Sequence, residues 1–339
     1  MSEILKHFTF EFKAGRDLEI AEVEAFFDSV ISCTDESVLI ELLSAWNSKG
    51  SSDDELFEIA KLMRRRMKTI SSEQTNVVDI VGTGGSGTKS FNVSTAAAFV
   101  IAGAGIPIAK HGNRAATSNS GSADVLTTLG INIDVTPEVT ENCLNELGIC
   151  FMYAPLFHKL SPALAKARRE LRQPTIFNNL GPLCNPAGAQ HRIIGVWSDT
   201  LVHKTARVLE RLGSGRSWVV FGREGIDEIA LYGQTEVADL SSEGITTRTI
   251  DSAEIGANPR NEDLPRRLSA LESARIVHDI LSNNRCGEDA EQLVLINAAA
   301  AIYVAGKSLD IREAYLCAEE SIRSGTAIEK LTALINATN

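Results

Sequence analysis

The sequence predicts an α/β protein in which a small all-helical domain accompanies a larger α/β domain, whose mostly parallel central sheet is flanked by helices. Residues 17–68 repeat apolar side chains at intervals of three and four, which is typical of amphipathic helices. After residue 76, short β-branched runs alternate with helical patterns, which indicates βαβ units and a parallel sheet. The 339 residues, of which 44% are hydrophobic, are sufficient for about two domains with real cores.

The N-terminal part predicts three helices, over residues 17–32, 36–50 and 52–68. Gly50 is a typical helix stop, and Ser52 followed by acidic residues is a typical helix start. The third helix ends in the basic run KLMRRRMK, which we interpret as a solvated helix face near a C-terminal dipole rather than as an anion site. The polar residues 69–76 then predict a linker.

The following part predicts strands that alternate with helices. Strands are expected over residues 77–81, 106–110, 148–154, 192–197, 217–222 and 235–240, and helices over residues 94–105, 122–130, 162–171 and 201–213. Residues 161–185 are rich in helical patterns again, so we expect them to pack with the N-terminal helices. The expected domains are therefore residues 1–72 with about 160–187, and residues 73–159 with about 188–339.

Composition and charge favour a cytoplasmic protein. The net charge of −11 argues against nucleic-acid binding, which normally requires a basic surface. The six cysteines form no metal-binding spacing and indicate buried thiols in a reducing compartment. The N-terminus has early charges and no apolar signal segment, and the most apolar run, residues 96–109, is too short to span a bilayer. We expect no nucleic-acid or membrane partner.

A glycine-rich loop follows the first predicted strand, in the run VVDIVGTGGSGTKSFNVST. Its glycines fit the dinucleotide fingerprint, but no acidic residue lies between Asp79 and Asp124 to bind the ribose hydroxyls. Thr88 stands where a P-loop requires lysine. The remaining interpretation is an anion cradle, in which glycine N–H groups and the polar side chains of Asn92, Ser94 and Thr95 meet a helix N-terminus.

A second polar loop follows the next predicted strand, in the run AKHGNRAATSNSGSADVL. It combines Lys110, His111 and Arg114 with an asparagine and several hydroxyls. Cationic and hydroxyl donors suit a ligand with several phosphate oxygens, whereas the plainer alternative is a polar surface loop. The two loops together predict a site for a phosphorylated ligand.

These loops and three later segments resemble the anthranilate phosphoribosyltransferase family. The resemblance rests on DIVGTGGSGTKSFNVSTAAAF, AKHGNRAATSNSGSADVLTTLGI, ARRELRQPTIFNNLGPLCNPA, GIDEIALYG and LINAAAAIYVAG, in the family's order. It implies transfer of phosphoribose from phosphoribosyl diphosphate (PRPP) to the amine of anthranilate in tryptophan biosynthesis. It also implies Mg²⁺ as the cofactor and a homodimer formed through the helical domain.

The resemblance implies a role for individual residues. The residues expected around PRPP are Gly82, Gly85, Ser86, Ser90, Asn92, Val93, Ser94, Thr95, Lys110, His111, Gly112, Asn113, Arg114, Ala115, Ala116, Thr117, Ser118 and Ser122. Gly82, Asn113, Arg168 and His158 are expected to bind anthranilate, and Ser94, Asp227 and Glu228 to bind the metal. No dedicated catalytic base is expected, because an aryl amine is already neutral at pH 7.

The sequence departs from the family pattern at Ser86, where the family usually has an acid. We expect this change to weaken the handling of PRPP or magnesium without abolishing it. Two alternative functions stay open. One is a pyrimidine nucleoside phosphorylase-like enzyme of the same fold, which does not need the Asp227–Glu228 pair. The other is a non-catalytic binding relative, against which the intact basic loop argues.

Overall fold

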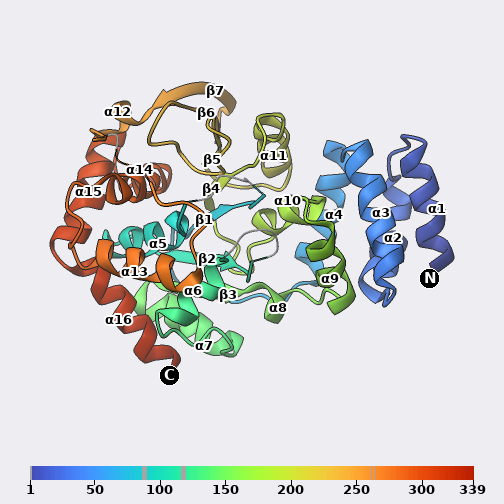
Figure 1. Ribbon diagram of the computed structural model, residues 1–339, viewed down its shortest axis with the longest axis horizontal. Helices are drawn as coiled ribbons and strands as arrows, with labels where there is room; N and C mark the ends of the chain where they lie inside the picture. The colour runs from blue at the N-terminus through green and yellow to red at the C-terminus, as the bar shows by residue number, and fades with distance from the viewer. Residues whose placement is uncertain (1, 86–89, 116–119, 261, 263) are drawn as a thin grey trace.

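The computed structural model describes residues 2–85, 90–115, 120–260, 262 and 264–339. In Figure 1 the sheet lies in the middle, with the N-terminal helices at the right and the C-terminal helices at the left. A small helical part thus accompanies a larger α/β part, and the expected fold class is confirmed.

Four helices form the N-terminal end: α1 (Ser2–Lys13), α2 (Val23–Ser32), α3 (Glu36–Lys49) and α4 (Asp53–Arg66), with the 3-10 turn η1 (Ile20–Glu22) before α2. The side chain of Asp35 caps α3, and a capping box of Ser52 and Glu55 begins α4. The sequence did not predict α1. Its buried Leu5, Phe8 and Phe12 follow the helical spacing and pack against α3, which stabilises this short segment.

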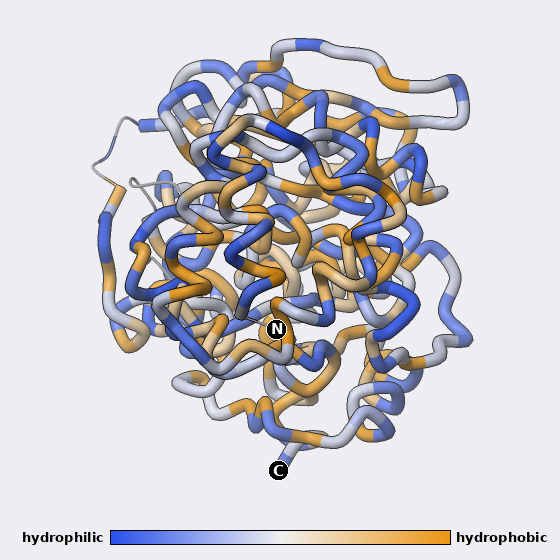
Figure 2. The backbone as a smooth tube through the Cα atoms, turned by 90° about the vertical axis from the view of Figure 1, so that its right-hand side faces the viewer, coloured by the Kyte–Doolittle hydropathy of each residue, from blue (hydrophilic) through white to orange (hydrophobic). Residues whose placement is uncertain are grey.

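Two later helices, α9 (Pro162–Leu171) and α10 (Ile176–Leu183), lie beside α3 and α4 (Figure 1). Leu164 and Leu180 are buried in the same apolar cluster as Leu42 and Trp46. The return of this segment to the N-terminal helices agrees with the expected packing, while the exact domain boundaries stay a prediction. Figure 2 looks onto this end and shows hydrophobic and hydrophilic residues alternating within single turns, as amphipathic helices require.

The basic run at the end of α4 divides between the surface and the interior. Arg65 and Arg66 form exposed ion pairs with Glu24, as a solvated face would. Arg64 instead points inward and donates to the carbonyls of Leu183 and Leu212, at 2.7 and 3.1 Å. The interpretation as a solvated face is therefore wrong for Arg64, because the backbone of α10 and of the segment after α11 (Thr200–Arg211) supplies acceptors that the sequence could not show.

The sheet has seven strands in the order β3-β2-β1-β4-β5-β6-β7. Their bounds are β1 (Val78–Gly82), β2 (Ile108–Gly112), β3 (Ile149–Tyr153), β4 (His191–Gly195), β5 (Ser217–Gly222), β6 (Gln234–Ser241) and β7 (Gly244–Asp251). The first five strands in chain order pair in parallel, whereas β6 and β7 add an antiparallel edge. All six predicted strands form. The sequence did not predict β7, whose largely exposed, polar Thr246–Thr249 run has no apolar alternation.

Helices cover both faces of the sheet. The remaining helices are α5 (Val93–Gly103), α6 (Ser122–Thr128), α7 (Pro137–Asn142), the π-helix η2 (Cys143–Leu147), α8 (Ala154–Phe157), α12 (Ser252–Ile255), α13 (Ala270–Leu281), α14 (Asp289–Val304), α15 (Ile311–Arg323) and α16 (Thr326–Thr338). Ile193 faces a core with α5 and α14, whereas its neighbour Ile194 faces the core shared with α11 and the N-terminal helices. The helical end is therefore continuous with one face of the sheet.

Parallel pairing places the carboxyl ends of the central strands at one edge of the sheet. Gly82, the last residue of β1, lies directly opposite Gly195, the last residue of β4. Both predicted polar loops leave from this edge, one after β1 and one after β2. In open parallel sheets, ligands bind outside the carboxyl ends of the strands. Among the described residues, no helix has the length and apolarity that a membrane span requires.

Candidate functional site

The glycine loop after β1 contacts the predicted acidic pair. The N–H of Gly84 donates to Asp227 Oδ2 at 2.7 Å. A methyl group added at Gly82 would lie 2.3 Å from the same oxygen, and one added at Gly195 would lie 1.7 Å from the Asp227 carbonyl oxygen. The two strand-end glycines therefore let the segment with Asp227 and Glu228 lie directly against the sheet edge.

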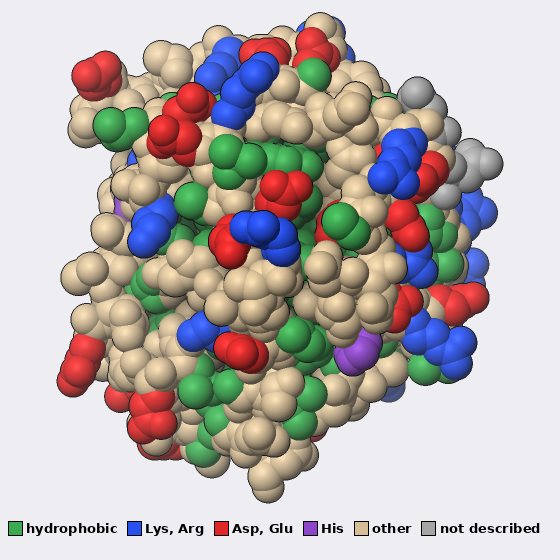
Figure 3. Space-filling model, turned by 90° about the vertical axis from the view of Figure 1, so that its left-hand side faces the viewer, with side chains coloured by type: hydrophobic (Ala, Val, Ile, Leu, Met, Phe, Trp, Pro, Cys, Tyr) green, Lys and Arg blue, Asp and Glu red, His purple; other side chains and the backbone are tan. Residues whose placement is uncertain are grey.

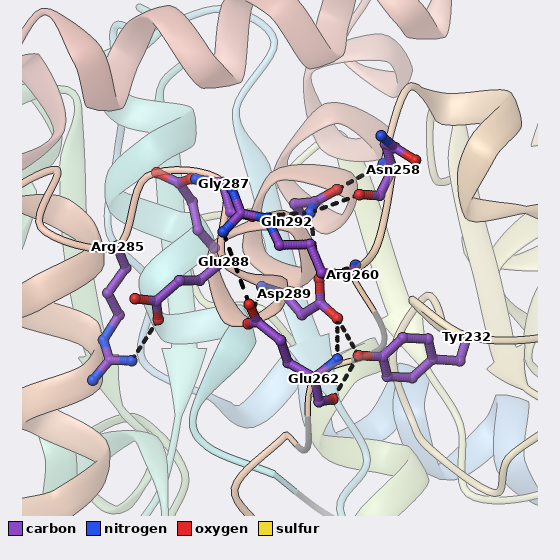
Figure 4. A network of polar contacts seen from close by, with 10 residues as sticks. Tyr232, Asn258, Arg260, Glu262, Arg285, Gly287, Glu288, Asp289 and Gln292 are labelled. Carbon is purple, nitrogen blue, oxygen red and sulfur yellow. Dashed lines mark hydrogen bonds and ion pairs between the residues drawn. The ribbon is translucent and has the colours of Figure 1, made fainter.

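Helix α14 holds the acidic segment from behind. Asn297 accepts from the N–H of Ile229 at 3.0 Å and donates to its carbonyl at 3.2 Å. At the start of α14, the Asp289 carboxylate accepts from the Tyr232 hydroxyl and from the Arg260 N–H (Figure 4). The segment after the acidic pair is thereby fixed at both ends, and the chain between β7 and α13 is tied to the same helix.

The second loop begins from a buried polar base at the end of β2. Lys110 is buried, and its Nζ donates to the Ile80 carbonyl at 2.7 Å and to Ser94 Oγ at 3.2 Å. Asp79 accepts from the His111 N–H at 3.3 Å and from Asn185 Nδ2 at 2.8 Å. Burial raises the pKa of Asp79, and the nearby Lys110 ammonium opposes this rise. The two loops are thus joined below the surface.

The outer part of the second loop is exposed. Arg114 pairs with Asp124 at 3.0 Å and lies over the ring of Tyr153 at 5.8 Å, while Asn113 accepts from the Arg114 N–H at 2.7 Å. Gly112, which lacks a Cβ, leaves room for Ser122 Oγ, which would otherwise lie 2.2 Å from it. The close return of the chain therefore brings Ser122, the first residue of α6, back to the end of β2.

The first turn of α5 is engaged by the rest of the protein. Asn92 Oδ1 accepts from Ser120 Oγ and from Ser273 Oγ, both at 3.0 Å, so this oxygen does not cap the helix. The Val93 side chain is fully buried, and Thr95 Oγ1 is buried without a hydrogen-bond partner among the described residues. Ser94, which is half-buried, presents its hydroxyl to Lys110.

Two histidines meet beneath the second loop. The rings of His111 and His158 lie 5.0 Å apart, and His111 Nδ1 lies 3.2 Å from the Gly181 carbonyl. Burial lowers the pKa of His111 to about 4 and that of His158 to about 3, so both imidazoles are neutral at pH 7. Their Nε2 atoms are buried and have no partner within the described part of the chain. Such nitrogens call for a polar ligand or water.

Arg168 of α9 turns toward the glycine loop. Its Nη2 donates to Asn178 Oδ1 at 3.2 Å, and its guanidinium lies 5.7 Å from the centre of the Phe177 ring. Asn178 Nδ2 in turn donates to the Thr83 carbonyl at 2.9 Å. Burial lowers the pKa of Arg168 to about 10, so it remains a cation at pH 7. Among the residues that the structure describes, no carboxylate pairs with it.

Known proteins are similar to this chain in sequence and in architecture. Residues 74–328 match the family described as "Glycosyl transferase family, a/b domain". The anthranilate phosphoribosyltransferase of Moorella thermoacetica is 40% identical over 323 residues, 95% of each chain, and that of Geobacter sulfurreducens is 39% identical over 95% of this chain and 96% of its own. The chain belongs to the anthranilate phosphoribosyltransferase family.

Solved structures of this family agree with the fold. The anthranilate phosphoribosyltransferase of Thermus thermophilus superposes with a TM-score of 0.84 at 33% identity, covering 98% of this chain and 99% of its own. The Saccharomyces cerevisiae enzyme in complex with PRPP and Mg has a TM-score of 0.88 at 28% identity, covering 99% and 98%. The same yeast enzyme has also been solved with 4-fluoroanthranilate, with a TM-score of 0.85 at 26% identity, covering 100% and 98%.

The structure brings together several of the residues that the family resemblance predicts for the site. Asp227 contacts Gly84 beside Gly82, Ser94 contacts Lys110, and His111 contacts His158. The predicted residues Gly82, Gly85, Ser90, Asn92–Thr95, Lys110–Ala115, Ser122, His158, Arg168, Asp227 and Glu228 all lie in described segments. Ser86, Ala116, Thr117 and Ser118 lie outside the described residues. The ligand roles of all these residues stay predictions.

Sequence reasoning missed the polar residues that support the site. Asp79, Asn178 and Asn297 each join a site segment to another part of the chain, through contacts between residues 32 to 95 positions apart. All three residues lie in segments that carry the family resemblance, and this was the one signal that could have pointed to them. Their partners are visible only in the folded chain.

Proposed function

We propose that this chain transfers the phosphoribosyl group of PRPP to the amine of anthranilate, giving N-(5-phosphoribosyl)anthranilate and pyrophosphate. One observation carries the proposal. At the carboxyl edge of the sheet, a glycine loop contacts an acidic segment through Gly84 and Asp227. The same loop is linked through Thr83 and Asn178 to Arg168, which pairs with no carboxylate among the described residues. A phosphorylated donor and a carboxylate-bearing acceptor require these two chemistries side by side.

The PRPP side is supported by the donors of the two loops. The hydroxyl of Ser94 and the Lys110 ammonium meet near the ends of β1 and β2, where the glycine loop begins. Arg114 and Asn113 extend this set at the surface. Hydrogen bonds from charged donors to phosphate oxygens are among the strongest that proteins make. These groups would bind PRPP and hold its anomeric carbon at a fixed position.

The acidic segment fits a magnesium ion. Asp227, Glu228 and Ser94 offer only hard oxygen donors, and the strand-end glycines leave room for Asp227 beside the loop. Within the described residues, no group of three or more histidine, cysteine or acidic side chains gathers as a complete metal cage. Mg²⁺ typically uses one or two carboxylates together with substrate phosphates and waters. When bound, the ion would neutralise charge that develops on the departing pyrophosphate.

The anthranilate side is supported by Arg168 and by the histidine pair. The guanidinium of Arg168 is held by Asn178 and by the Phe177 ring, so it would meet a carboxylate at low entropic cost. The neutral imidazoles of His111 and His158 present buried nitrogens that need a polar partner. Asn113 and the backbone of Gly82 would complete the slot.

The reaction balances without a protein base. The bond between the anomeric carbon and pyrophosphate breaks, and pyrophosphate leaves with the electron pair. The anthranilate nitrogen forms the new bond to this carbon and releases one proton to solvent. Lys110 and the loop N–H groups would stabilise the leaving group, which is electrostatic catalysis. Positioning of the two substrates would supply much of the remaining rate.

Anthranilate fluorescence tests the function directly, because it falls when the amine is ribosylated. We expect a decline that requires both PRPP and Mg²⁺. Constant fluorescence with both present would overturn the proposal. Phosphorolysis of thymidine without Mg²⁺ would instead establish the pyrimidine nucleoside phosphorylase alternative, and binding without any turnover would establish a non-catalytic relative.

Neighbouring arginines on α9 provide a matched pair of variants. Arg168→Gln removes the proposed carboxylate contact, so kcat/KM for anthranilate should fall about 10- to 100-fold, as for one charged hydrogen bond. Arg169→Gln, at an exposed position on the same helix, should change little. Equal losses in both variants would show that Arg168 does not bind the acceptor. A cytoplasmic location and a homodimer stay predictions.

A further inference from the structure

We propose that Asn178 is a positioning residue that couples the two substrate sites. Binding of PRPP at the glycine loop would orient Arg168 for the acceptor, and binding of the acceptor at Arg168 would strengthen PRPP binding. The inference rests on the proposed function and deepens it. It concerns a side chain that need not touch either substrate, because its contacts are made to the protein groups that would.

The amide of Asn178 is used at both ends. Oδ1 accepts from Arg168 Nη2 at 3.2 Å and from the Thr175 N–H at 3.0 Å, and Nδ2 donates to the Thr83 carbonyl at 2.9 Å. Arginine and the amide N–H only donate, and a carbonyl only accepts, so the orientation of the amide is determined by its partners. No other side chain of this size could serve all three partners in the same way.

The Thr83 end of this contact leads on to the acidic segment. Gly84 follows Thr83 directly, and its N–H is bound by Asp227 Oδ2. The loop also lies close to the segment that precedes α10, because a methyl group added at Gly85 would lie 2.4 Å from Pro174. A continuous set of hydrogen bonds therefore runs from Arg168 through Asn178 and the glycine loop to Asp227.

Few hydrogen bonds among the described residues hold the Arg168 side chain in place. Arg168 Nε is buried and has no partner within the described part of the chain, and burial alone accounts for its lowered pKa. Its one side-chain hydrogen bond among these residues is the bond to Asn178. A shift of the glycine loop around a phosphorylated ligand would move Asn178 Nδ2 with the Thr83 carbonyl and would redirect Arg168. Coupling of this kind is reciprocal for binding free energies.

Benzoate provides the test, because it keeps the carboxylate of anthranilate and lacks the attacking amine. Its Kd is measured by calorimetry on the full chain, with and without saturating PRPP and Mg²⁺. We expect PRPP to tighten benzoate binding in the unaltered protein by about 5- to 150-fold, the usual range for coupled sites. In Asn178→Ala this factor should fall below about 2.

The adjacent Asn179 supplies the control. It lies on the same helix and is buried, but its Oδ1 accepts from Thr205, and among the described residues no hydrogen bond joins its side chain to Arg168 or Thr83. Asn179→Ala should therefore keep the coupling factor of the unaltered protein. Asn178→Asp is a second variant, in case the alanine variant does not fold. It keeps the acceptors for Arg168 and the Thr175 N–H but cannot donate to Thr83, so the coupling should again be lost.

Three outcomes would overturn the inference: no coupling in the unaltered protein, an unchanged factor in the Asn178 variants, or an equal loss in Asn179→Ala. Failure of the proposed function is recognised separately, because it would appear as an unaltered protein that does not consume anthranilate. Active protein with unchanged coupling in Asn178→Ala overturns the coupling role alone.

Discussion

His111 and His158 show at the scale of single residues how burial sets the chemistry of the site. Both rings are buried and 5.0 Å apart, and burial lowers their pKa values to about 4 and about 3. Their protonation is therefore favoured in the unfolded chain, where the pKa of histidine is about 6.5. Between that value and the folded pKa values the unfolded state binds more protons, so the free energy of unfolding falls as the pH falls.

His158→Asn should remove one of these two contributions. On going from pH 7 to pH 5, the unaltered protein should lose about 2 kcal/mol more unfolding free energy than the variant. This is the contribution of one imidazole that is protonated only in the unfolded chain over the roughly 1.5 pH units between its unfolded pKa and pH 5. Urea unfolding at both pH values measures this difference. His203→Asn, at an exposed position, should lose as much unfolding free energy between pH 7 and pH 5 as the unaltered protein. Identical pH dependence in all three proteins would mean that His158 is protonated as easily when folded as when unfolded.

At the scale of elements, the meeting of two strand ends with one loop segment builds the candidate site. β1 and β4 both end in glycine, and the segment between β5 and β6 lies against these ends. α14 supports that segment from the other side through Asn297 and Asp289. The geometry of the candidate site thus depends on close backbone approach, which a single methyl group is enough to disturb.

Gly82→Ala should displace the Asp227 carboxylate from the Gly84 N–H, because the new methyl group would lie 2.3 Å from Oδ2. The Mg²⁺ concentration for half-maximal activity should rise about 10-fold, as expected when a charged hydrogen bond near a ligand is lost. Gly103→Ala is the matched control, since its methyl group would lie 2.2 Å from Ser321 Oγ, in the contact of α5 with α15. It should lower the melting temperature and leave the Mg²⁺ dependence unchanged. A similar shift of that dependence in both variants would assign the effect to general destabilisation.

At the scale of the whole molecule, exposed large apolar side chains lie at both ends of the protein. On the face around α14 to α16, side chains of both charge signs are interspersed (Figure 3), and the net charge of the sequence is −11. At the opposite end, α1 exposes Phe10 and Ile4, with 69% and 42% of their surface accessible. Leu309 before α15 and Leu316 on α15 are also exposed, with 96% and 59% of their surface accessible, so the homodimer through the helical part stays a prediction.

Phe10→Asp should weaken such a dimer, because it places a charge where an aromatic side chain would be buried. The dissociation constant should rise about 10- to 30-fold, as for an aromatic residue central to an interface. Sedimentation equilibrium over a range of protein concentrations measures it. Leu309→Asp, at an exposed position before α15, should have no effect. A monomeric unaltered protein, or a dimer indifferent to Phe10→Asp, would rule out this interface.

The sequence by itself determined the fold class and six of the seven strands, because hydrophobic periodicity is a property of short segments. It also predicted the chemistry of the two loops from their local order of glycines and donors. The resemblance pointed to Arg168 as the acceptor cation, whereas spacing alone did not distinguish it from Arg169 and Arg172. The tertiary structure decided which arginine turns inward, since Asn178 and Phe177 lie beside Arg168 while its two neighbours are exposed. It likewise brought Asp227 to Gly84, across 143 residues of chain. Such contacts depend on how distant elements pack, and no local pattern specifies them.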